Sequence, residues 1–379
     1  MQKIISSRIT EAREARAFSM GELADSIGIT RQSISKYEKG IINPMPEVLQ
    51  SISNTLDFPI DFFYKTRNPS SSASSALFFR SKAQIPQKAQ VACLYQIIWS
   101  DEIKRQLDTY ANFITPNVPT SNIEYDELSG SDIEELALDI RNGWGLGDNP
   151  IGDLIGILEN NGVIVSQFAT NKFCGFKGID AFSSWKNGVP YILYHSIQKS
   201  AVRTRFSLLH ELGHLVMHST ISSDDAKKKV IVDLADSQAD RFAAAFLLPA
   251  TSFPNDIRGT SLSSLKITKS KWGVALSTII RRCETLELLS DNQLSYLKRQ
   301  MTTLKYWRKE PLDDVITING PEMLRDAILL LIENKIISRD AFLNTSALSA
   351  EDLKAICSLP DDFFSGYNSR QKPVLRLLH

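Results

Sequence analysis

The stretch Arg203–His218 reads RTRFSLLHELGHLVMH, and it decides the architecture of the middle of this 379-residue chain. Its apolar residues recur at helical spacing, which predicts one long helix. His210 and His214 would lie about 40° apart around that helix, so both imidazoles can reach one metal ion. Glu211 between them faces the same side and can take a proton from water bound to that metal. Because buried imidazoles need a polar partner, the pattern favours a metal site over two solvated histidines.

A tetrahedral metal site that does chemistry needs a third protein ligand and one open position. The next helical pattern, around Leu234–Leu248 and ended by Pro249, carries Asp236 and Asp240 four residues apart. Asp236 is placed to bind the metal. Asp240 is placed to accept a hydrogen bond from a metal-binding histidine and so fix its tautomer. The alternative for Asp236 is a simple charge at a helix N-terminus, which the helix dipole favours.

Two further histidines lie near this motif. His218 follows on the same helix, and no glycine separates it from His214 to turn the chain, so we expect it to support the ligands or the fold rather than to bind the metal. His195 follows an apolar strand at Tyr191–Tyr194 and could line the cleft, although a lone histidine is more often structural. That strand is a candidate edge for a bound substrate peptide.

From about residue 131 the pattern becomes α+β. Ser131–Glu134 resembles a capping box that opens a helix ending near Gly143. Three short apolar runs predict strands, and Lys186–Gly188 predicts a hairpin turn between the last two. These runs are Val163–Phe168, Ala181–Trp185 and Tyr191–Tyr194.

Residues 19–40 read SMGELADSIGITRQSISKYEKG, a pattern of two short helices joined by a tight turn. Ser19 and Thr30 can cap the two helices, and Gly28 permits the turn between them. The second helix turns Ile34 inwards. Its outer side chains are of the kinds that bond base edges in the major groove of DNA. They are Arg31, Gln32, Ser33 and Lys36.

Charge alone does not decide whether this region binds DNA. The chain has 43 Lys and Arg against 43 Asp and Glu, and residues 1–65 hold eight of each sign. Such a weakly charged monomer binds DNA poorly at physiological salt, and a small helical interaction domain remains an alternative. If the region reads an operator in double-stranded DNA, we expect a homodimer, because one such module reads few bases.

Cysteine usage and hydropathy predict a cytoplasmic protein that does not cross a membrane. No two cysteines form a CxxC pair, which argues against a thiolate zinc site or a disulfide framework. The longest apolar run, at residues 327–332, is far too short to span a bilayer. The N-terminus lacks the apolar centre of a signal peptide. The four cysteines are Cys93, Cys174, Cys283 and Cys357.

Two family resemblances connect these observations. The N-terminal segment is similar to the Cro/C1-type (XRE) DNA-binding domain at Leu23-Ala24, Gly28, Ile34, Tyr37-Glu38, Gly40, Pro44 and Leu49. The middle of the chain resembles the ImmA/IrrE family of zinc metallopeptidases at Arg203–Phe206, Leu209–His214, His218, Ala239–Ala243 and Leu247–Pro249. Members of that family resemble gluzincins, whose third zinc ligand is usually Glu, whereas this chain has Asp236 at that position.

The resemblances imply a multidomain chain. We expect an all-α helix-turn-helix domain at residues 1–67, then a Ser-rich linker and helical connector at 68–124. An α+β zincin-like (gluzincin-type) metallopeptidase domain would follow at 125–255, and a mainly helical C-terminal region at 256–379. The linker includes Asn68–Ala76, which has almost nothing to bury.

The function implied is that of a DNA-binding regulatory zinc metallopeptidase. Glu211 would activate the zinc-bound water, and the substrate would be a repressor or antitoxin-like protein, because relatives cleave Cro/C1-like regulators. The alternative is a transcriptional regulator or antitoxin whose zincin-like domain senses a metal or ligand without catalysis. Asp236 in place of Glu favours that alternative, and the intact Glu211 opposes it.

Overall fold

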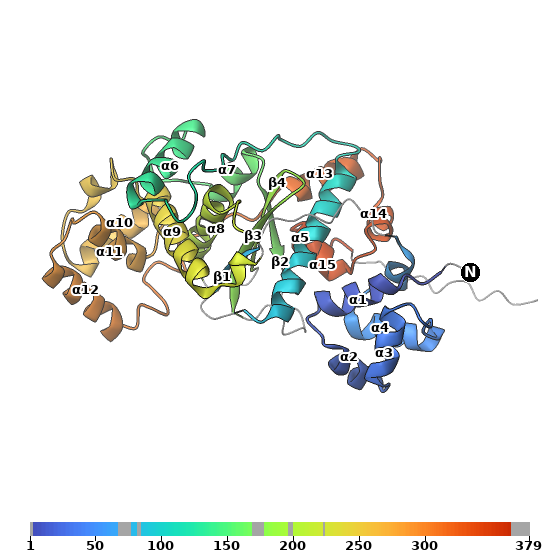
Figure 1. The fold of residues 1–379 in the computed structure, drawn as a ribbon. Helices are drawn as coiled ribbons and strands as arrows, with labels where there is room; N and C mark the ends of the chain where they lie inside the picture. Colours follow the sequence, from blue (N-terminus) through green and yellow to red (C-terminus); the bar gives the residue numbers. More distant parts are fainter. Residues whose placement is uncertain are drawn as a thin grey trace, which may run out of the picture.

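The computed structural model describes residues 3–66, 77–81, 85–168, 178–195, 200–222 and 224–364. These residues form an N-terminal helical unit, a four-stranded sheet covered by helices, and further helices that follow (Figure 1). The predicted multidomain architecture is confirmed. The predicted Ser-rich linker at Asn68–Ala76 and Cys174 lie outside the described residues. Within the described part, no helix has the length and apolar character needed to cross a membrane.

The N-terminal unit has the predicted caps and turn. Ser19 accepts a hydrogen bond from the backbone of Glu22, whose carboxylate bonds back to Ser19, and Thr30 caps the next helix. Gly28 has φ +72°, the left-handed conformation that ends a helix at little cost. The elements are α1 (Ser6–Ala15), α2 (Met20–Ile27), α3 (Arg31–Glu38), α4 (Pro46–Leu56) and a 3₁₀ turn, η1 (Ile60–Tyr64).

The sheet has the strand order β1-β3-β4-β2. The predicted hairpin is confirmed: β3 and β4 are antiparallel, and Asn187 and Gly188 both have positive φ between them. β2 runs parallel to β4, and β1 runs antiparallel to β3. The strands are β1 (Phe78–Ser81), β2 (Ile164–Phe168), β3 (Ile179–Lys186) and β4 (Val189–His195).

Two expectations about local structure were wrong. The strand that contains Tyr191–Tyr194 is not an edge, because β4 lies between β3 and β2. The helix ending at Gly143 begins with a capping box of Ser129 and Asp132, two residues before the one expected. The sequence patterns also did not predict β1, which is a short segment that pairs with a strand about one hundred residues later.

One face of the sheet carries the helix with His210, Glu211 and His214 and the helix that packs on it. The long helix α8 (Ala201–Met217) packs on β3 and β4, and α9 (Lys229–Leu247) packs on α8. We call the apolar cluster on this side the second core; from the sheet it takes side chains such as Val165, Ala181 and Ile192. It also contains residues of α6 (Gly130–Gly143), α7 (Leu154–Asn160), α10 (Leu262–Trp272), α11 (Leu276–Thr285) and α12 (Asp291–Thr303).

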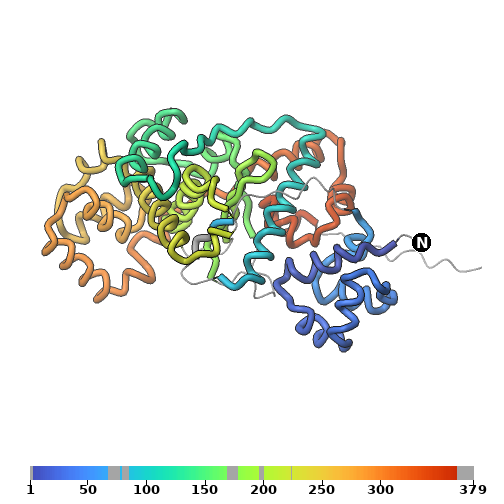
Figure 2. The backbone as a smooth tube through the Cα atoms, in the orientation of Figure 1, coloured from blue at the N-terminus to red at the C-terminus, as the bar shows by residue number. Residues whose placement is uncertain are grey.

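The other face of the sheet belongs to a first core, which also contains the N-terminal unit. Alternate strand residues, such as Ile164, Phe182 and Leu193, point into it. It continues through α5 (Gln87–Leu107) and the late helices α13 (Met323–Glu333), α14 (Arg339–Ser346) and α15 (Ala350–Ile356). Figure 2 shows the blue N-terminal helices and the red late helices near one another. The helices after residue 256 therefore divide between two cores.

Buried polar contacts join the N-terminal unit to this first core. Arg16 donates two parallel hydrogen bonds, of 2.8 and 2.6 Å, to the carboxylate oxygens of Asp352 at the start of α15. Trp99 of α5 donates to Glu11 of α1 at 2.8 Å. These groups are nearly excluded from water, so losing one partner would leave the other group buried with fewer polar contacts. The N-terminal helices are thus fixed to α5 and α15.

Candidate functional site

Three side chains from α8 and α9 meet where the two helices pack together. The Nε2 atoms of His210 and His214 lie 3.0 Å apart. One carboxylate oxygen of Asp236 lies 3.8 Å from the first of these nitrogens and 3.5 Å from the second. The histidine side chains are almost completely buried, whereas that of Asp236 is 39% exposed. Among the described residues, this is the group of His, Cys, Asp or Glu whose donor atoms could share one metal ion.

The donor spacing fits a tetrahedral metal ion. Ligand atoms about 2.1 Å from a tetrahedral centre stand about 3.4 Å from one another. The three separations of 3.0, 3.5 and 3.8 Å fall around that value. Two imidazole nitrogens and one carboxylate oxygen are also donors that zinc accepts. The three predicted ligands are therefore brought together in an arrangement that can hold a metal.

Gly213 lets α9 approach α8 closely enough for this arrangement. A Cβ atom at this position would stand 3.1 Å from Cδ1 of Phe242 and 3.3 Å from Cα of Ala239. Both distances are tighter than ordinary van der Waals contact, so a side chain here would push the helices apart. The close approach puts the middle of α9, with Asp236 and Asp240, opposite the two histidines.

Asp240 contacts the outer nitrogen of the first histidine. Its Oδ1 lies 2.9 Å from Nδ1 of His210, and its other oxygen accepts a 3.1 Å hydrogen bond from Arg281 of α11. A carboxylate only accepts at neutral pH, so Nδ1 of His210 carries the hydrogen and Nε2 presents its lone pair to the metal group. This is the contact predicted for Asp240.

A longer chain of hydrogen bonds fixes the ring orientation of His214. Nδ1 of His214 lies 2.8 Å from Nδ1 of His218, and Nε2 of His218 lies 2.9 Å from Oε1 of Gln238. Gln238 in turn donates to the backbone oxygen of Tyr125 at 2.6 Å, which fixes its amide orientation. For His214 to present a lone pair at Nε2, its Nδ1 must donate to a neutral His218. Burial lowers the pKa of His218 to about 4, which keeps it neutral.

Glu211 points from α8 towards the sheet. The hydroxyl of Ser183, on β3, donates to its carboxylate at 2.7 Å. Glu211 is fully buried, and the neighbouring α5 places Cys93 close enough for Glu211 to contribute to the raised pKa of that thiol, after burial itself. The carboxylate is therefore oriented by a strand that packs against α8.

The structure places the remaining sequence candidates elsewhere. His195 ends β4, beside Phe168, and burial lowers its pKa, but it is not part of the metal group. On α3, Arg31, Gln32 and Lys36 are exposed and Ser33 is half-buried, with its hydroxyl 3.0 Å from that of Thr30. α3 lies at the end of the molecule away from α10–α12 (Figure 1).

Sequence reasoning missed three residues that support the metal group or Glu211. Gln238 lies between the two predicted aspartates, so the helical spacing that singled them out places it on another face. Ser183 and Arg281 are far from the motif in sequence, and no pattern in their own segments marks them. Their roles depend on strand pairing and helix packing, which local periodicity does not specify.

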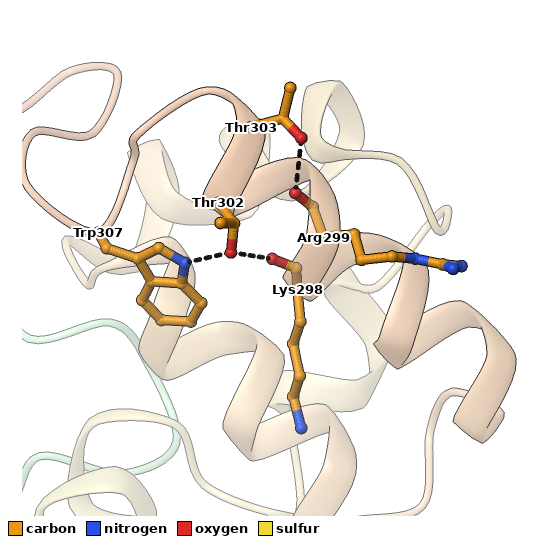
Figure 3. Close-up of a pocket in the computed structure, with 5 residues that line it drawn as sticks. All are labelled: Lys298, Arg299, Thr302, Thr303 and Trp307. Atoms are coloured by element: carbon orange, nitrogen blue, oxygen red, sulfur yellow. Dashed lines mark hydrogen bonds between the residues drawn. The ribbon is translucent and has the colours of Figure 1, made fainter.

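A shallow pocket of about 440 Å³ lies away from this chemistry, on α12 and the turn after it (Figure 3). The indole of Trp307 donates to the hydroxyl of Thr302 at 3.0 Å, and the other lining residues are cationic or hydroxyl-bearing. Its lining contains no carboxylate, thiol or imidazole. The lining residues are Lys298, Arg299, Thr302, Thr303 and Trp307.

The hydrogen-bond relay from His214 through His218 to Gln238 can be tested by mutation. Replacing Gln238 with alanine removes the acceptor for His218 and frees both rings to rotate, so we expect metal affinity to fall about 10- to 100-fold. Competition with a chromogenic chelator measures this change. Gln50→Ala, an exposed change on α4, is the matched control and should leave the affinity unaltered. An unaltered affinity in Gln238→Ala would show that the relay does not position His214.

Comparison with known proteins gives matches in two parts of the chain. Residues 9–63 match the helix-turn-helix family model, and residues 176–284 match the model of the IrrE N-terminal-like domain. The second match begins just before β3 and extends into α11, and so includes the metal group. It ends beyond Pro249, where the resemblance seen in the sequence ended.

Curated relatives match the N-terminal part. An uncharacterized HTH-type transcriptional regulator of Sinorhizobium medicae is 41% identical over 61 residues, which are 16% of this chain and 44% of the relative. The SPbeta prophage-derived uncharacterized HTH-type transcriptional regulator YonR of Bacillus subtilis is 38% identical over 58 residues, 15% of this chain and 54% of the relative. The chain thus spans about half the length of these relatives. Taken together, the matches identify a chain that joins an XRE-type helix-turn-helix domain to an IrrE/ImmA-like domain of the metallopeptidase type.

Proposed function

We propose that this chain is a DNA-binding regulatory zinc metallopeptidase that hydrolyses a peptide bond in a repressor or antitoxin-like protein. The observation that carries the proposal is the juxtaposition on α8 of two histidines and Glu211. The donor atoms of the histidines and of Asp236 lie close enough together to bind one metal ion. The carboxylate of Glu211 accepts a hydrogen bond from Ser183. A metal-binding scaffold alone would not need a buried, oriented carboxylate beside the ligands.

Zinc is the metal we propose for the His210, His214 and Asp236 group, because its donors and spacing suit a four-coordinate ion with one open position. Such an ion, when bound, polarises a carbonyl and makes water a better nucleophile. Asp240 and the relay through His218 keep the lone pairs of the two imidazoles directed at the ion. The side chain of Asp236 is partly exposed, so we expect a substrate to approach the metal group from the Asp236 side.

Glu211 is the proposed general base. Its carboxylate takes the proton of the attacking water and then delivers it to the leaving amine. Burial keeps competing water away from the carboxylate, and the hydroxyl of Ser183 holds it in one orientation. Ser183 is thus a positioning residue.

The helix-turn-helix would bring the enzyme to an operator, with Arg31, Gln32, Ser33 and Lys36 of α3 as the base-reading side chains. Three of these are exposed, as major-groove contact requires. The balanced charge of residues 1–65 supports a homodimer, because two modules double the contacts with phosphates and bases.

Base reading by α3 can be measured on DNA selected from a random pool by the purified chain. We expect Arg31→Ala to weaken binding to that DNA by about 1–3 kcal/mol and to relax the preference at one base position. Arg299→Ala removes the same charge from an exposed position on α12 and should leave the affinity and preference unaltered. Equal losses in both variants would mean that Arg31 contributes only general electrostatic attraction.

The proposed function as a whole is tested in cells that carry either the wild-type chain or Glu211→Gln. We expect new protein N-termini, mapped by mass spectrometry, that appear only with the wild-type chain and lie in a regulator encoded by the same cells. If the two strains show identical N-termini but the His210→Ala strain differs in transcription, a metal-sensing regulator without catalysis is the better account.

A further inference from the structure

The sheet edge nearest the metal group is covered by a segment of the chain itself. β1 pairs antiparallel with β3, and its residue Phe78 stands directly opposite Ser183. Opposed residues in an antiparallel pair point to the same face of the sheet. Ser183 donates to Glu211, so Phe78 also points to the face where the metal group lies.

Phe78 lies against the metal-binding histidines. Its ring is stacked on that of His214, with ring centres 4.6 Å apart and planes within 8° of parallel. It also approaches His218, at 5.7 Å. The side chain is only 9% exposed and packs in a small apolar cluster with Ile221 and Ala235. The residue next to Ala235 is the ligand candidate Asp236. Phe78 thus contacts residues on both sides of the metal group.

In the proposed peptidase, an extended substrate segment could bind at the same place. An extended segment gains backbone hydrogen bonds by adding to a sheet edge, with pockets for alternate side chains. In the described sheet the edges are β1 and β2, and β2 lies on the far side of β4 from β3. The outer edge of β3, next to Glu211 and the metal group, is therefore available only when β1 leaves it.

We propose that β1 is an internal occupant of the substrate position, which keeps the enzyme inhibited until the strand is displaced. This inference rests on the proposed function. It also names the substrate class: an extended polypeptide segment with a large apolar side chain where Phe78 now lies. A folded regulator would be cut only in a segment able to become extended.

The covalent connection between β1 and α5 strengthens this inhibition. β1 ends at Ser81 and α5 begins at Gln87, and α5 is fixed to α1 through the hydrogen bond from Trp99 to Glu11. A strand held on so short a tether has an effective concentration of about millimolar, so a substrate at micromolar concentration competes poorly. Because α5 packs on both α1 and β3, movement of the helix-turn-helix would alter the position of β1.

The test measures whether a peptide can occupy the outer edge of β3, and it does not require hydrolysis. The full-length chain with Glu211→Gln is compared with the same chain carrying Phe78→Ala in addition. The probe is a dye-labelled synthetic peptide of residues 76–83, ALFFRSKA. We expect the peptide to bind at least tenfold more tightly to the Phe78→Ala chain, because its own strand no longer competes well. Backbone amides of β3 should also exchange with deuterium faster in that chain.

Three controls define the outcome. Leu77→Ala, made in the same Glu211→Gln chain, changes the neighbouring half-buried side chain, which packs on the first core, and should leave peptide binding at the level of Glu211→Gln alone. Phe78→Leu keeps an apolar side chain without the ring and should give an intermediate affinity even if Phe78→Ala folds poorly. A probe with aspartate in place of its first phenylalanine should not bind.

Equal peptide affinity in the chains with and without Phe78→Ala would overturn the proposal. Cleavage of the wild-type chain within residues 77–81 would also overturn it, because the strand would then be a substrate rather than an inhibitor. Neither readout depends on activity against another protein. A failure of the proposed peptidase function, which the Glu211→Gln comparison of hydrolysis tests, is therefore distinguishable from a failure of this inference.

Discussion

Glu211→Gln is expected to lower kcat/KM for peptide hydrolysis by about a thousandfold or more while leaving the bound metal in place. The amide has the size of the carboxylate and can still accept the hydrogen bond from Ser183, but it cannot take a proton from water. The ligand group of His210, His214 and Asp236 is untouched by the change. Steady-state kinetics on the identified substrate, together with metal analysis of the same sample, measures both effects.

Glu159→Gln is the matched control. Glu159 is also a buried glutamate, and burial raises its pKa to about 7, so a neutral side chain suits its surroundings. Its Oε1 accepts hydrogen bonds from the backbone of Glu322 and Met323, which a single amide oxygen can also accept. We expect this variant to keep wild-type kinetics. If Glu211→Gln keeps both its metal and its hydrolytic rate, Glu211 is not the base.

His210→Ala is expected to reduce the metal content from about one ion per chain to nearly none. It removes one of three donors and leaves Asp240 without the ring that it orients. Because the site binds metal only when folded, chelation should lower the melting temperature of the wild-type chain and not that of the variant. Elemental analysis and thermal unfolding with and without chelator measure these effects.

His195→Ala serves as the control for removing a histidine. His195 lies at the end of β4, outside the metal group, so the variant should keep its metal and its response to the chelator. A His210→Ala chain that still holds one ion per chain would place the metal elsewhere and remove the basis of the peptidase proposal.

The sequence was sufficient where the decisive interactions are local. Ser19, Thr30 and Gly28 act through their own backbone and the next turn, so their residue types predict the caps and the turn correctly. The meeting of His210 and His214 also follows from helical geometry alone. Whether Asp236 joins them depends on how α9 packs against α8, which helical periodicity does not specify. The small residue Gly213 lets these two helices come close.

The sequence was insufficient where partners are distant. β1 has only four residues, and its strand character depends on pairing with β3 about one hundred residues later. The interior position of β4 likewise depends on how β2 returns to the sheet, which alternation within the strand does not encode. The division of the late helices between two cores is a property of packing, since amphipathic periodicity indicates a buried face without naming its partner.

The contact between Arg16 and Asp352 has a consequence for the order of events during synthesis. The N-terminal helices emerge from the ribosome first, but α13–α15, which cover part of the same core, are made more than 250 residues later. Until then the apolar surface of the early helices is uncovered on this side, and the guanidinium of Arg16 lacks the carboxylate of Asp352. A chain truncated before α13 would therefore have N-terminal helices with an exposed apolar surface. Chaperones and cellular proteases recognise such surfaces.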